Sequence, residues 1–243
     1  DGTCCPDSLI LRRIPQTAGA TAGGIVMENR IPSHRRTVVL ALFAAIIVVL
    51  AFTPLGFIPL PFIKMTIIHI PVILGALLLG PKCGACLGFL FGLTSLINNT
   101  ISPAITSFTF TPFYPLPGSD KGSWLSLIVC FVPRILVGVI PYFVYRLIQH
   151  LLHAEKPGNT VSLAAAGVAG ALTNTVFVMG LIFLLFSDAY AAAKGIGPEL
   201  VLGVILAIVG TNGIPEAIGA GILVAAIGKA LFAIQNSRKG LAS

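Results

Sequence analysis

The chain has 243 residues, of which 56% are hydrophobic and 9% carry a charge, and its formal net charge is +7. Soluble domains carry about 25% charged residues, so this composition, with a mean hydropathy of +0.98, excludes an ordinary soluble domain. The positive charge does not indicate nucleic-acid binding, because most basic residues lie between long apolar runs, as they do in membrane proteins.

The first 26 residues differ from the rest of the chain. They are polar and lack the apolar stretch that a secretory signal peptide requires. Met27 is followed by Glu28, Asn29 and Arg30 and then by the first long apolar run. We therefore interpret residues 1–26 as a disordered or non-native extension, and we expect residues 27–243 to form a single integral membrane domain.

Six apolar segments are predicted to cross the membrane, because about 20 apolar residues in a helix span a bilayer. In chain order they are residues 37–55, 64–79, 84–98, 124–147, 161–186 and 198–227. The second and third are short and are joined by a tight turn at Gly80-Pro81. The predicted fold is an all-α membrane protein, a bundle of six transmembrane helices.

The distribution of basic residues predicts the orientation of this bundle. With both termini in the cytoplasm, the inner segments hold nine basic residues and the outer segments hold three. The inner nine are Arg30, Arg35, Arg36, Lys82, Arg146, Lys156, Lys229, Arg238 and Lys239, and the outer three are Lys64, Lys121 and Lys194. Because Lys and Arg accumulate on the cytoplasmic side, N and C termini are both expected to be cytoplasmic.

Two loops that this topology places outside are rich in proline and aromatic residues. They are residues 56–62 and 102–118. Long loops in compact domains are uncommon unless they have a function. They are expected either to close over an outward-facing pocket or to act as static plugs over the helix ends.

Small residues recur at four-residue spacing in three predicted spans. They are Ala41 and Ala45; Gly84, Gly88 and Gly92; and Gly213, Ala217, Gly221 and Ala225. Such stripes let helix backbones approach closely in lipid. For the glycine-containing stripes we favour packing within the bundle. For Ala41 and Ala45, internal packing and docking of a partner are equally compatible with the sequence.

Two charged residues lie inside predicted spans, where ionisable groups are costly and often functional. Arg134 follows Pro133, and Glu216 follows Pro215. Arg134 is suited to bind a carboxylate or another anionic group of a small ligand. The alternatives are that Arg134 and Glu216 pair with each other, that Arg134 binds backbone carbonyls, or that a pair opens toward the substrate.

Asparagines within or at the ends of the spans form a second candidate set. Asn98 and Asn99 end the third span, Asn174 lies in the middle of the fifth, and Asn212 lies in the middle of the sixth. An asparagine side chain both donates and accepts hydrogen bonds, so it suits hydroxyl and amide groups. We expect a shared pocket formed by Asn98, Asn99, Arg134, Asn174, Asn212 and Glu216, the alternative being polar contacts between helices.

The sequence contains few features that would indicate a metal site or an enzyme. His69 has no second histidine or carboxylate at metal-ligand spacing, so a packing or hydrogen-bonding role is expected for it. Cys83 and Cys86 form a C-x-x-C, which we interpret as two small residues at a helix interface. The sequence shows no P-loop, no Gly-x-Ser-x-Gly and no H-E-x-x-H. Neither a metal nor a cofactor is expected.

Several motifs together resemble one family, the substrate-binding S components of energy-coupling factor (ECF) vitamin transporters of bacteria. They are Ala41-Leu-Phe-Ala-Ala45, Ile70-Pro-Val-Ile-Leu-Gly75, Leu79-Gly-Pro-Lys-Cys-Gly-Ala85, Phe131-Val-Pro-Arg-Ile-Leu-Val-Gly138 and Thr211-Asn-Gly-Ile-Pro-Glu216. The resemblance covers residues 36–228. Residues 92–100 and 107–113 make the chain most similar to the pantothenate-specific branch.

The resemblance implies a multi-pass subunit of the bacterial cytoplasmic membrane that binds one vitamin and performs no chemistry. It implies as partners a transmembrane coupling subunit, which docks on Ala41 and Ala45, and two cytosolic ATPase subunits. The alternatives are an S component for another vitamin (pyridoxine or hydroxymethylpyrimidine type, or riboflavin), a stand-alone secondary transporter, and an intramembrane enzyme. Pantothenate carries a carboxylate, an amide and two hydroxyls, which match Arg134 and the asparagines.

Overall fold

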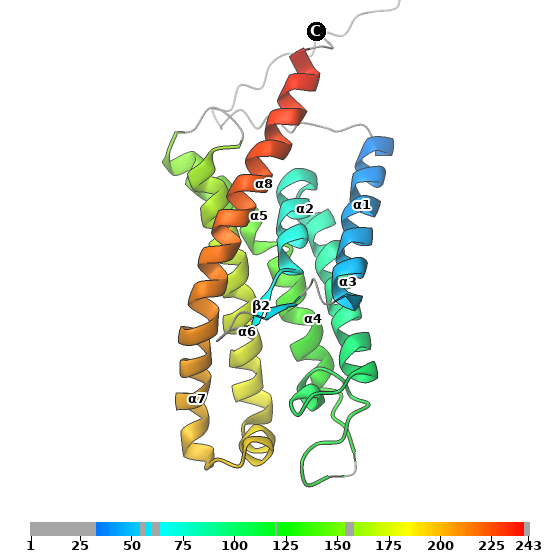
Figure 1. The fold of residues 1–243 in the computed structure, drawn as a ribbon, viewed down its shortest axis with the longest axis vertical. Coiled ribbons are helices and arrows are strands. Elements are labelled where there is room, and N and C mark those ends of the chain that lie inside the picture. Colours follow the sequence, from blue (N-terminus) through cyan, green and yellow to red (C-terminus); the bar gives the residue numbers. More distant parts are fainter. Residues whose placement is uncertain (1–32, 54–56, 60–63, 120, 154–157, 241–243) are drawn as a thin grey trace, which may run out of the picture. The chain divides into compact units, whose positions relative to one another are not determined.

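The computed structural model describes residues 33–53, 57–59, 64–119, 121–153 and 158–240. The chain divides between Ile31 and Pro32, and every described residue belongs to the second unit. The expected extension, residues 1–26, therefore lies outside the described residues. Within them, the fold is helical except for one short hairpin (Figure 1).

The elements begin with α1 (Ser33–Phe52), β1 (Phe57–Pro59), β2 (Lys64–Thr66), α2 (His69–Leu79) and α3 (Pro81–Ile101). They continue with η2 (Ser107–Thr109), α4 (Ser126–Val137), α5 (Ile140–Leu151) and α6 (Thr160–Lys194), and end with η3 (Pro198–Leu200), α7 (Val201–Ile208), η4 (Val209–Gly213) and α8 (Ile214–Gly240).

Five segments are long and apolar enough to cross a membrane: His34–Phe52, Pro81–Ile101, Ser126–Leu151, Thr160–Lys194 and Pro198–Ile234. The all-helical membrane fold is thus confirmed.

The predicted second span is the part that differs. Its first residues form strand β2, which pairs antiparallel with β1, and helix α2 begins only at His69. Helix α2 has 11 residues, which at 1.5 Å per residue is about half the thickness of the hydrocarbon core. It ends at Gly80, whose φ of 92° suits glycine. Pro81 then opens α3, a position where its missing N–H costs nothing.

Local sequence also explains the breaks in the longer spans. Helix α4 ends at Val137, and α5 begins at Ile140 with Pro141 in its first turn. Phe186 interrupts α6 with non-helical φ and ψ of −135° and 22°. Between α7 and α8 lies the π-helical turn η4, just before Pro215. A proline cannot donate to the preceding turn, which accounts for an irregular segment at this point.

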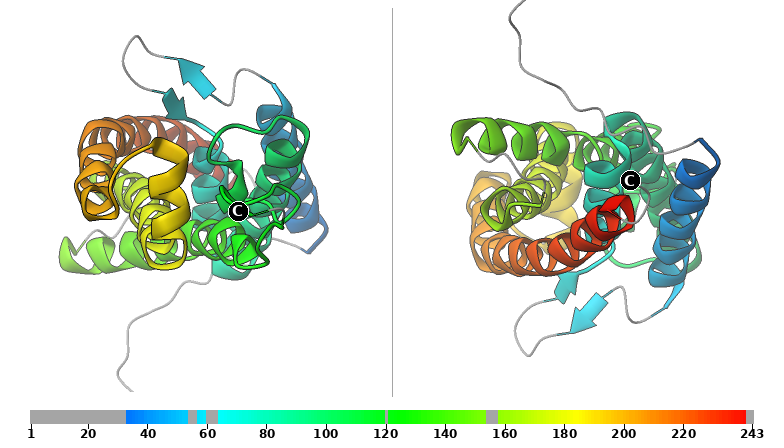
Figure 2. Two further views of the ribbon diagram at one scale, coloured as in Figure 1. Left: turned by 90° about the horizontal axis from the view of Figure 1, so that it is seen from below. Right: turned by 90° about the horizontal axis from the view of Figure 1, so that it is seen from above.

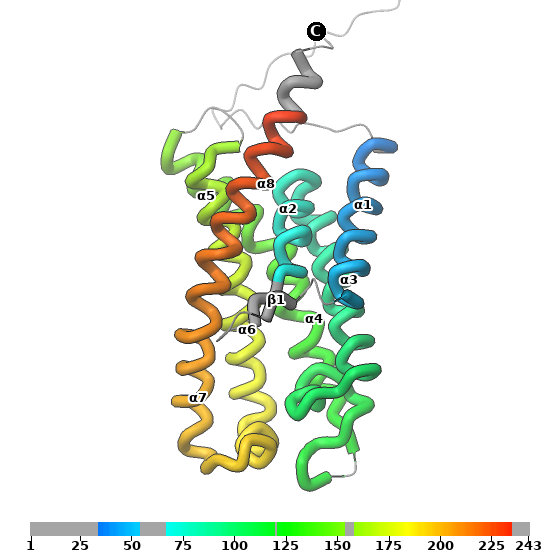
Figure 3. The backbone as a smooth tube through the Cα atoms, viewed as in Figure 1, coloured from blue at the N-terminus to red at the C-terminus, as the bar shows by residue number. Residues whose placement is uncertain are grey.

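With the short helix α2 counted among them, successive spans run in opposite directions, with α4 and α5 forming one span and α7 and α8 another. The first turn of α1, the α2–α3 turn and the end of α8 lie at one end, and the loop after α3 and the α6–α7 connection lie at the other (Figures 1 and 3). The described beginning and end of the unit therefore share one side. Helices α6 and α8 run next to each other, and α3 packs against both α1 and α4.

Glycines set the closest helix contacts in this unit. A Cβ added to Gly84 on α3 would lie 1.9 Å from the carbonyl oxygen of Gly138, and one on Gly88 would lie 2.2 Å from that of Arg134. On the other side of the bundle, a Cβ on Gly167 of α6 would meet the backbone of α8 at Ala220, 2.6 Å away. The packing interpretation of the glycine-containing stripes is thus supported by the geometry.

Helix α1 has a different character. Its buried side chains, Phe43, Ile47 and Ala51, follow one stripe and belong to the packed interior, and α1 contacts α2 and α3. Ala41 and Ala45 are instead exposed. They share the outward face with large apolar side chains, among them Leu42 (59% exposed) and Val49 (56%). Internal packing therefore does not explain the alanine pair.

We predict that Gly84→Val destabilises the protein, whereas Gly203→Val is tolerated. A valine at position 84 must push α3 away from the backbone at Gly138, and overpacking typically costs about 1–3 kcal/mol or more. Gly203 on α7 has nothing within 4 Å of an added Cβ, so it is a matched control. Thermal denaturation of both variants in detergent measures the difference, and equal melting temperatures would contradict the close contact between α3 and Gly138.

Candidate ligand-binding site

Arg134 is a buried cation of α4, with 7% of its surface exposed. Its Nη1 donates to the carbonyl oxygen of Val129 over 2.9 Å. Its guanidinium carbon lies 4.9 Å from the ring centre of Phe110 and 5.7 Å from that of Phe91. Its Nε is buried without a hydrogen-bond partner. The aromatic faces stabilise the positive charge without neutralising it.

Glu216 is not the partner of Arg134. Oε1 of Glu216 lies 3.5 Å from Nδ1 of His69 on α2, so a histidine is a close neighbour of this carboxylate. Both residues are buried, His69 with 1% and Glu216 with 8% of its surface exposed. The direct pairing of Arg134 with Glu216 that the sequence allowed is therefore wrong, and the interaction of Arg134 with a backbone carbonyl is present.

The loop after α3 holds Phe110 in place over Arg134. Phe108 in η2 is fully buried in an apolar cluster that includes Val129 of α4 and Ile182 of α6. Ser126 at the start of α4 donates its hydroxyl to the carbonyl oxygen of Phe108 over 2.7 Å. This part of the loop is therefore packed against the helices, as expected for a fixed cover over helix ends.

The two asparagines at the end of α3 have different roles. Asn99 donates from Nδ2 to the carbonyl oxygen of Ser95, and its Oδ1 accepts from the hydroxyl of Ser107 over 2.8 Å. Ser107 also accepts from the backbone N–H of Ala104. Asn99 thus anchors the loop that carries Phe110. Asn98 is half-buried beside it.

The predicted asparagines of the last two spans lie on neighbouring elements. Asn174 is half-buried on α6, and its Oδ1 is buried without a hydrogen-bond partner. Asn212 is half-buried within the π-helical turn η4, which contacts α6. Helix α6 also contacts α4, α8 and α2. It is therefore the common neighbour of the elements that carry Arg134, Asn212, Glu216 and His69.

Unsatisfied polar atoms occur on several of the predicted residues and on His69. Buried polar groups in proteins are nearly always hydrogen-bonded. In the described part of the chain, both ring nitrogens of His69, Nε of Arg134 and Oδ1 of Asn174 are buried without such a bond. They lie on α2, α4 and α6. Side chains of this kind can receive a polar ligand at little further desolvation cost.

His69 is a buried polar residue that was not among the predicted site residues. It was expected to pack or to hydrogen-bond, and a metal role was disfavoured because it lacked ligands at suitable spacing. Among the described residues, three or more metal-ligating side chains do not gather anywhere. The usable signal was the presence of a histidine and a glutamate, each inside an apolar segment, since such groups usually find a partner there.

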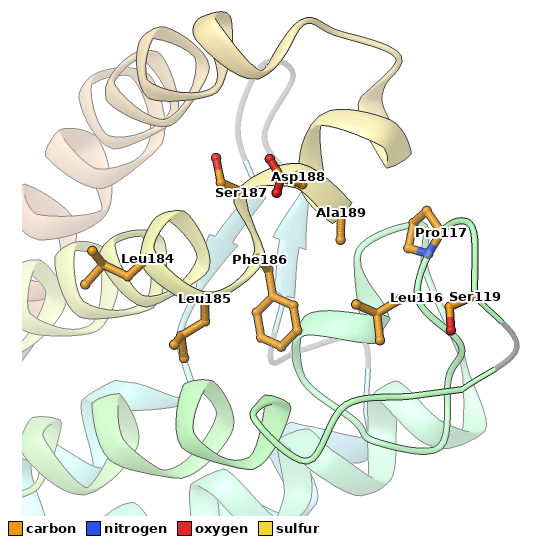
Figure 4. A pocket seen from close by; sticks show the side chains of 9 residues that line it. All are labelled: Leu116, Pro117, Ser119, Leu184, Leu185, Phe186, Ser187, Asp188 and Ala189. Atoms are coloured by element: carbon orange, nitrogen blue, oxygen red, sulfur yellow. The ribbon is translucent and has the colours of Figure 1, made fainter.

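A cavity of about 460 Å³ lies elsewhere, between the loop after α3 and the interrupted part of α6. It is lined by Leu116, Pro117, Ser119, Leu184, Leu185, Phe186, Ser187, Asp188 and Ala189. Figure 4 shows Leu116 and Phe186 from the two segments facing each other, with the carboxylate of Asp188 directed away. The cavity includes none of the six predicted site residues, and its one charged residue is acidic.

The hairpin is the described part of the other proline-rich loop. Strands β1 and β2 lie at the edge of the bundle, beside the start of α2 (Figures 1 and 2). Residues 60–63 lie outside the described residues. The expectation that this loop closes over a pocket therefore stays a prediction.

The C-x-x-C carries a structural contact. Sγ of Cys83 accepts a hydrogen bond from Nε of Arg36 over 3.3 Å, and Nη2 of Arg36 donates to the carbonyl oxygen of Leu79 over 3.0 Å. Arg36 thus ties α1 to the α2–α3 turn. Cys83 and Cys86 are both free thiols. The contact of Cys83 agrees with its interpretation as a small residue at a helix interface, whereas Cys86 is exposed.

Several membrane-spanning helices around buried polar side chains define the class: a multi-pass membrane protein with an internal polar site. The family model described as "ECF transporter, substrate-specific component" matches residues 35–228. The chain belongs to this family, and it is a transport protein of the membrane.

The chain is also similar in sequence to two named transport proteins. The chain is 41% identical over 165 residues to the pantothenic acid transporter PanT of Lactococcus lactis subsp. cremoris (strain MG1363). The aligned region covers 68% of this chain and 76% of that protein. It is 34% identical over 205 residues to the pantothenate transporter PanT of Leuconostoc mesenteroides subsp. mesenteroides, which covers 81% of this chain and 92% of that protein.

Proposed function

We propose that this chain binds pantothenate and delivers it into the cell as the S component of an ECF transporter. Family membership supports the role of substrate-binding subunit, and the names of both relatives support the ligand. The observation that carries the proposal within this chain is Arg134. It is a buried guanidinium that contacts two aromatic rings and a backbone carbonyl, and within the described part of the chain no carboxylate is found to pair with it.

The charge of Arg134 favours an anionic ligand. A buried charge is costly unless it is paired, and removal of one member of such a pair leaves the other uncompensated. A ligand carboxylate that accepts from the guanidinium forms a charge-assisted hydrogen bond, which is stronger than a neutral one. Pyridoxine and hydroxymethylpyrimidine have no carboxylate, so they leave this charge uncompensated.

The remaining predicted residues complete the proposed site. Asn174 and Asn212 suit the amide and hydroxyl groups of pantothenate, because each side chain offers both a donor and an acceptor. Asn98 stands at the end of α3, and Asn99 holds the loop that covers Arg134. Glu216 is an acceptor for ligand hydroxyls beside His69.

We further propose that transport requires partner subunits. The sequence holds no P-loop, so ATP hydrolysis falls to two cytosolic ATPase subunits, connected through a transmembrane coupling subunit. The exposed small-residue face of α1 at Ala41 and Ala45 supports docking of that subunit. Small residues allow close approach of a foreign helix, and bulkier apolar side chains flank them.

In the proposed orientation both termini are cytoplasmic. The bias of nine inner against three outer basic residues supports it.

We predict that a cysteine introduced at Ser119, in a variant without native cysteines, reacts with a membrane-impermeant maleimide in intact cells. A cysteine at His150 is expected to react only after the membrane is permeabilised. The reverse pattern would overturn the orientation.

Pantothenate binding is expected to depend on Arg134. The purified protein should bind pantothenate better than pantothenol, in which CH2OH replaces the carboxylate. In Arg134→Met this preference should disappear, because loss of a desolvated charge pair costs about 2–5 kcal/mol, which is roughly 30-fold or more in Kd. Calorimetric titration measures both ligands.

The control for this titration is Cys130→Ser, which changes a buried neighbour of Arg134 on the same helix and leaves the guanidinium in place. It should keep the preference for the carboxylate. Pantothenate binding that is unchanged in Arg134→Met would show that another group binds the carboxylate. A protein that binds riboflavin or pyridoxine but not pantothenate would assign the chain to another vitamin.

A substitution on the exposed face of α1 is expected to block docking of the coupling subunit without affecting pantothenate binding. Ala41→Trp is expected to abolish pantothenate uptake in cells while the purified variant binds pantothenate normally, because position 41 is exposed and the indole needs no repacking inside the bundle. Ile222→Trp on α8 is the matched control, since Ile222 is 64% exposed on another helix. Normal uptake with Ala41→Trp would place the docking face elsewhere.

A further inference from the structure

The start of helix α2 is an unusual place for a polar side chain. Helix α2 begins at His69 in the middle of the bundle, beside the hairpin (Figure 1). Ile68, which precedes it, provides no side-chain cap. The N–H groups of a first helical turn lack partners within the helix, and the helix dipole makes this end partly positive. Half-length helices in transporters commonly direct such ends at substrates.

His69 itself is buried without a hydrogen bond. Its surface is 1% exposed, and neither ring nitrogen has a hydrogen-bond partner. Oε1 of Glu216 lies 3.5 Å from its Nδ1. N–H···O hydrogen bonds in proteins measure about 2.7–3.2 Å. The side chain of His69 on α2 therefore faces that of Glu216 on α8, and their separation is slightly too long for a direct hydrogen bond.

This geometry suits hydroxyl groups. A hydroxyl donates one hydrogen bond and accepts others, so it can donate to the carboxylate of Glu216 and accept from a ring N–H of His69. A ligand carboxylate does not suit the same place, because Glu216 would repel it. The pair and Arg134 therefore select opposite ends of a ligand. Helix α2 contacts both α4 and α8, which carry these groups.

We propose that His69 and Glu216 form the subsite for the hydroxyl-bearing end of the substrate, with Arg134 at its carboxylate end. The proposal rests on the proposed function. The two hydroxyls of pantothenate lie at the end opposite its carboxylate, so one orientation satisfies both groups. His69 is accordingly a specificity-determining residue that selects for hydroxyls.

The test compares pantothenate with 4-deoxypantothenate, in which a methyl group replaces the terminal CH2OH. The natural protein should bind pantothenate at least tenfold more tightly. In His69→Leu the ratio of the two Kd values should fall toward one, and His69→Gln, which keeps a donor and an acceptor, should retain part of it. This ratio is insensitive to a general loss of stability, which weakens both ligands alike.

Ser162→Ala is the matched control, because Ser162 on α6 is also a fully buried polar residue whose hydroxyl lacks a hydrogen-bond partner. It should leave the ratio unchanged. A full preference for pantothenate in both His69→Leu and His69→Gln would overturn the subsite alone. Failure of the natural protein to bind pantothenate would overturn the proposed function and the subsite with it. If His69→Leu does not fold, the ratio in His69→Gln and in Glu216→Gln decides.

Discussion

The hydrocarbon core of a membrane contains no water, and this constraint governs the whole protein. Every backbone polar group must be satisfied within the chain, which explains why the spans are helices. Charged side chains are correspondingly rare in the spans, and Arg134 and Glu216 are each enclosed by other elements. Arg134 lies between Phe91 and Phe110, and Glu216 lies opposite His69. The buried polar groups are thus distributed over several elements that contact α6.

The bundle has two kinds of helix surface, one packed through glycines inside it and one exposed on α1. Glycines at positions 84, 88 and 138 bring α3 against the backbone of α4 and its end so closely that a single methyl group would clash. This contact fixes the position of Arg134, whose carbonyl oxygen forms part of it. The outward face of α1 is different, because Ala41 and Ala45 are exposed between larger apolar side chains. Under the proposed function, the closely packed interior holds the ligand and the exposed face of α1 receives the partner.

Irregular backbone lies where the polar residues lie. Helix α2 starts halfway through the bundle at His69, η4 interrupts the helix at Asn212, and Pro215 immediately precedes Glu216. In lipid such irregularities are tolerated only where they are buried in protein or line a cavity. Their concentration on α2 and on the segment from η4 to α8 supports the proposed ligand site at these elements. The 460 Å³ cavity near Asp188 also lies at a break in a helix, at Phe186, but it contains none of the six predicted site residues.

The sequence by itself determined the helical membrane class, five of the six predicted spans and the packing role of the glycine stripes, because length, hydropathy and four-residue spacing are local properties. It also identified Arg134, Asn174 and Glu216 as residues that need an explanation inside the membrane. Only the tertiary structure decided that the second apolar segment is a hairpin strand followed by a half-length helix. It also decided that Glu216 faces His69 and that Arg134 faces Phe110. These partners come from segments far apart in the chain. Which of them meet depends on the rotation and depth of each helix, and hydropathy does not encode that in helices that are apolar on nearly every side.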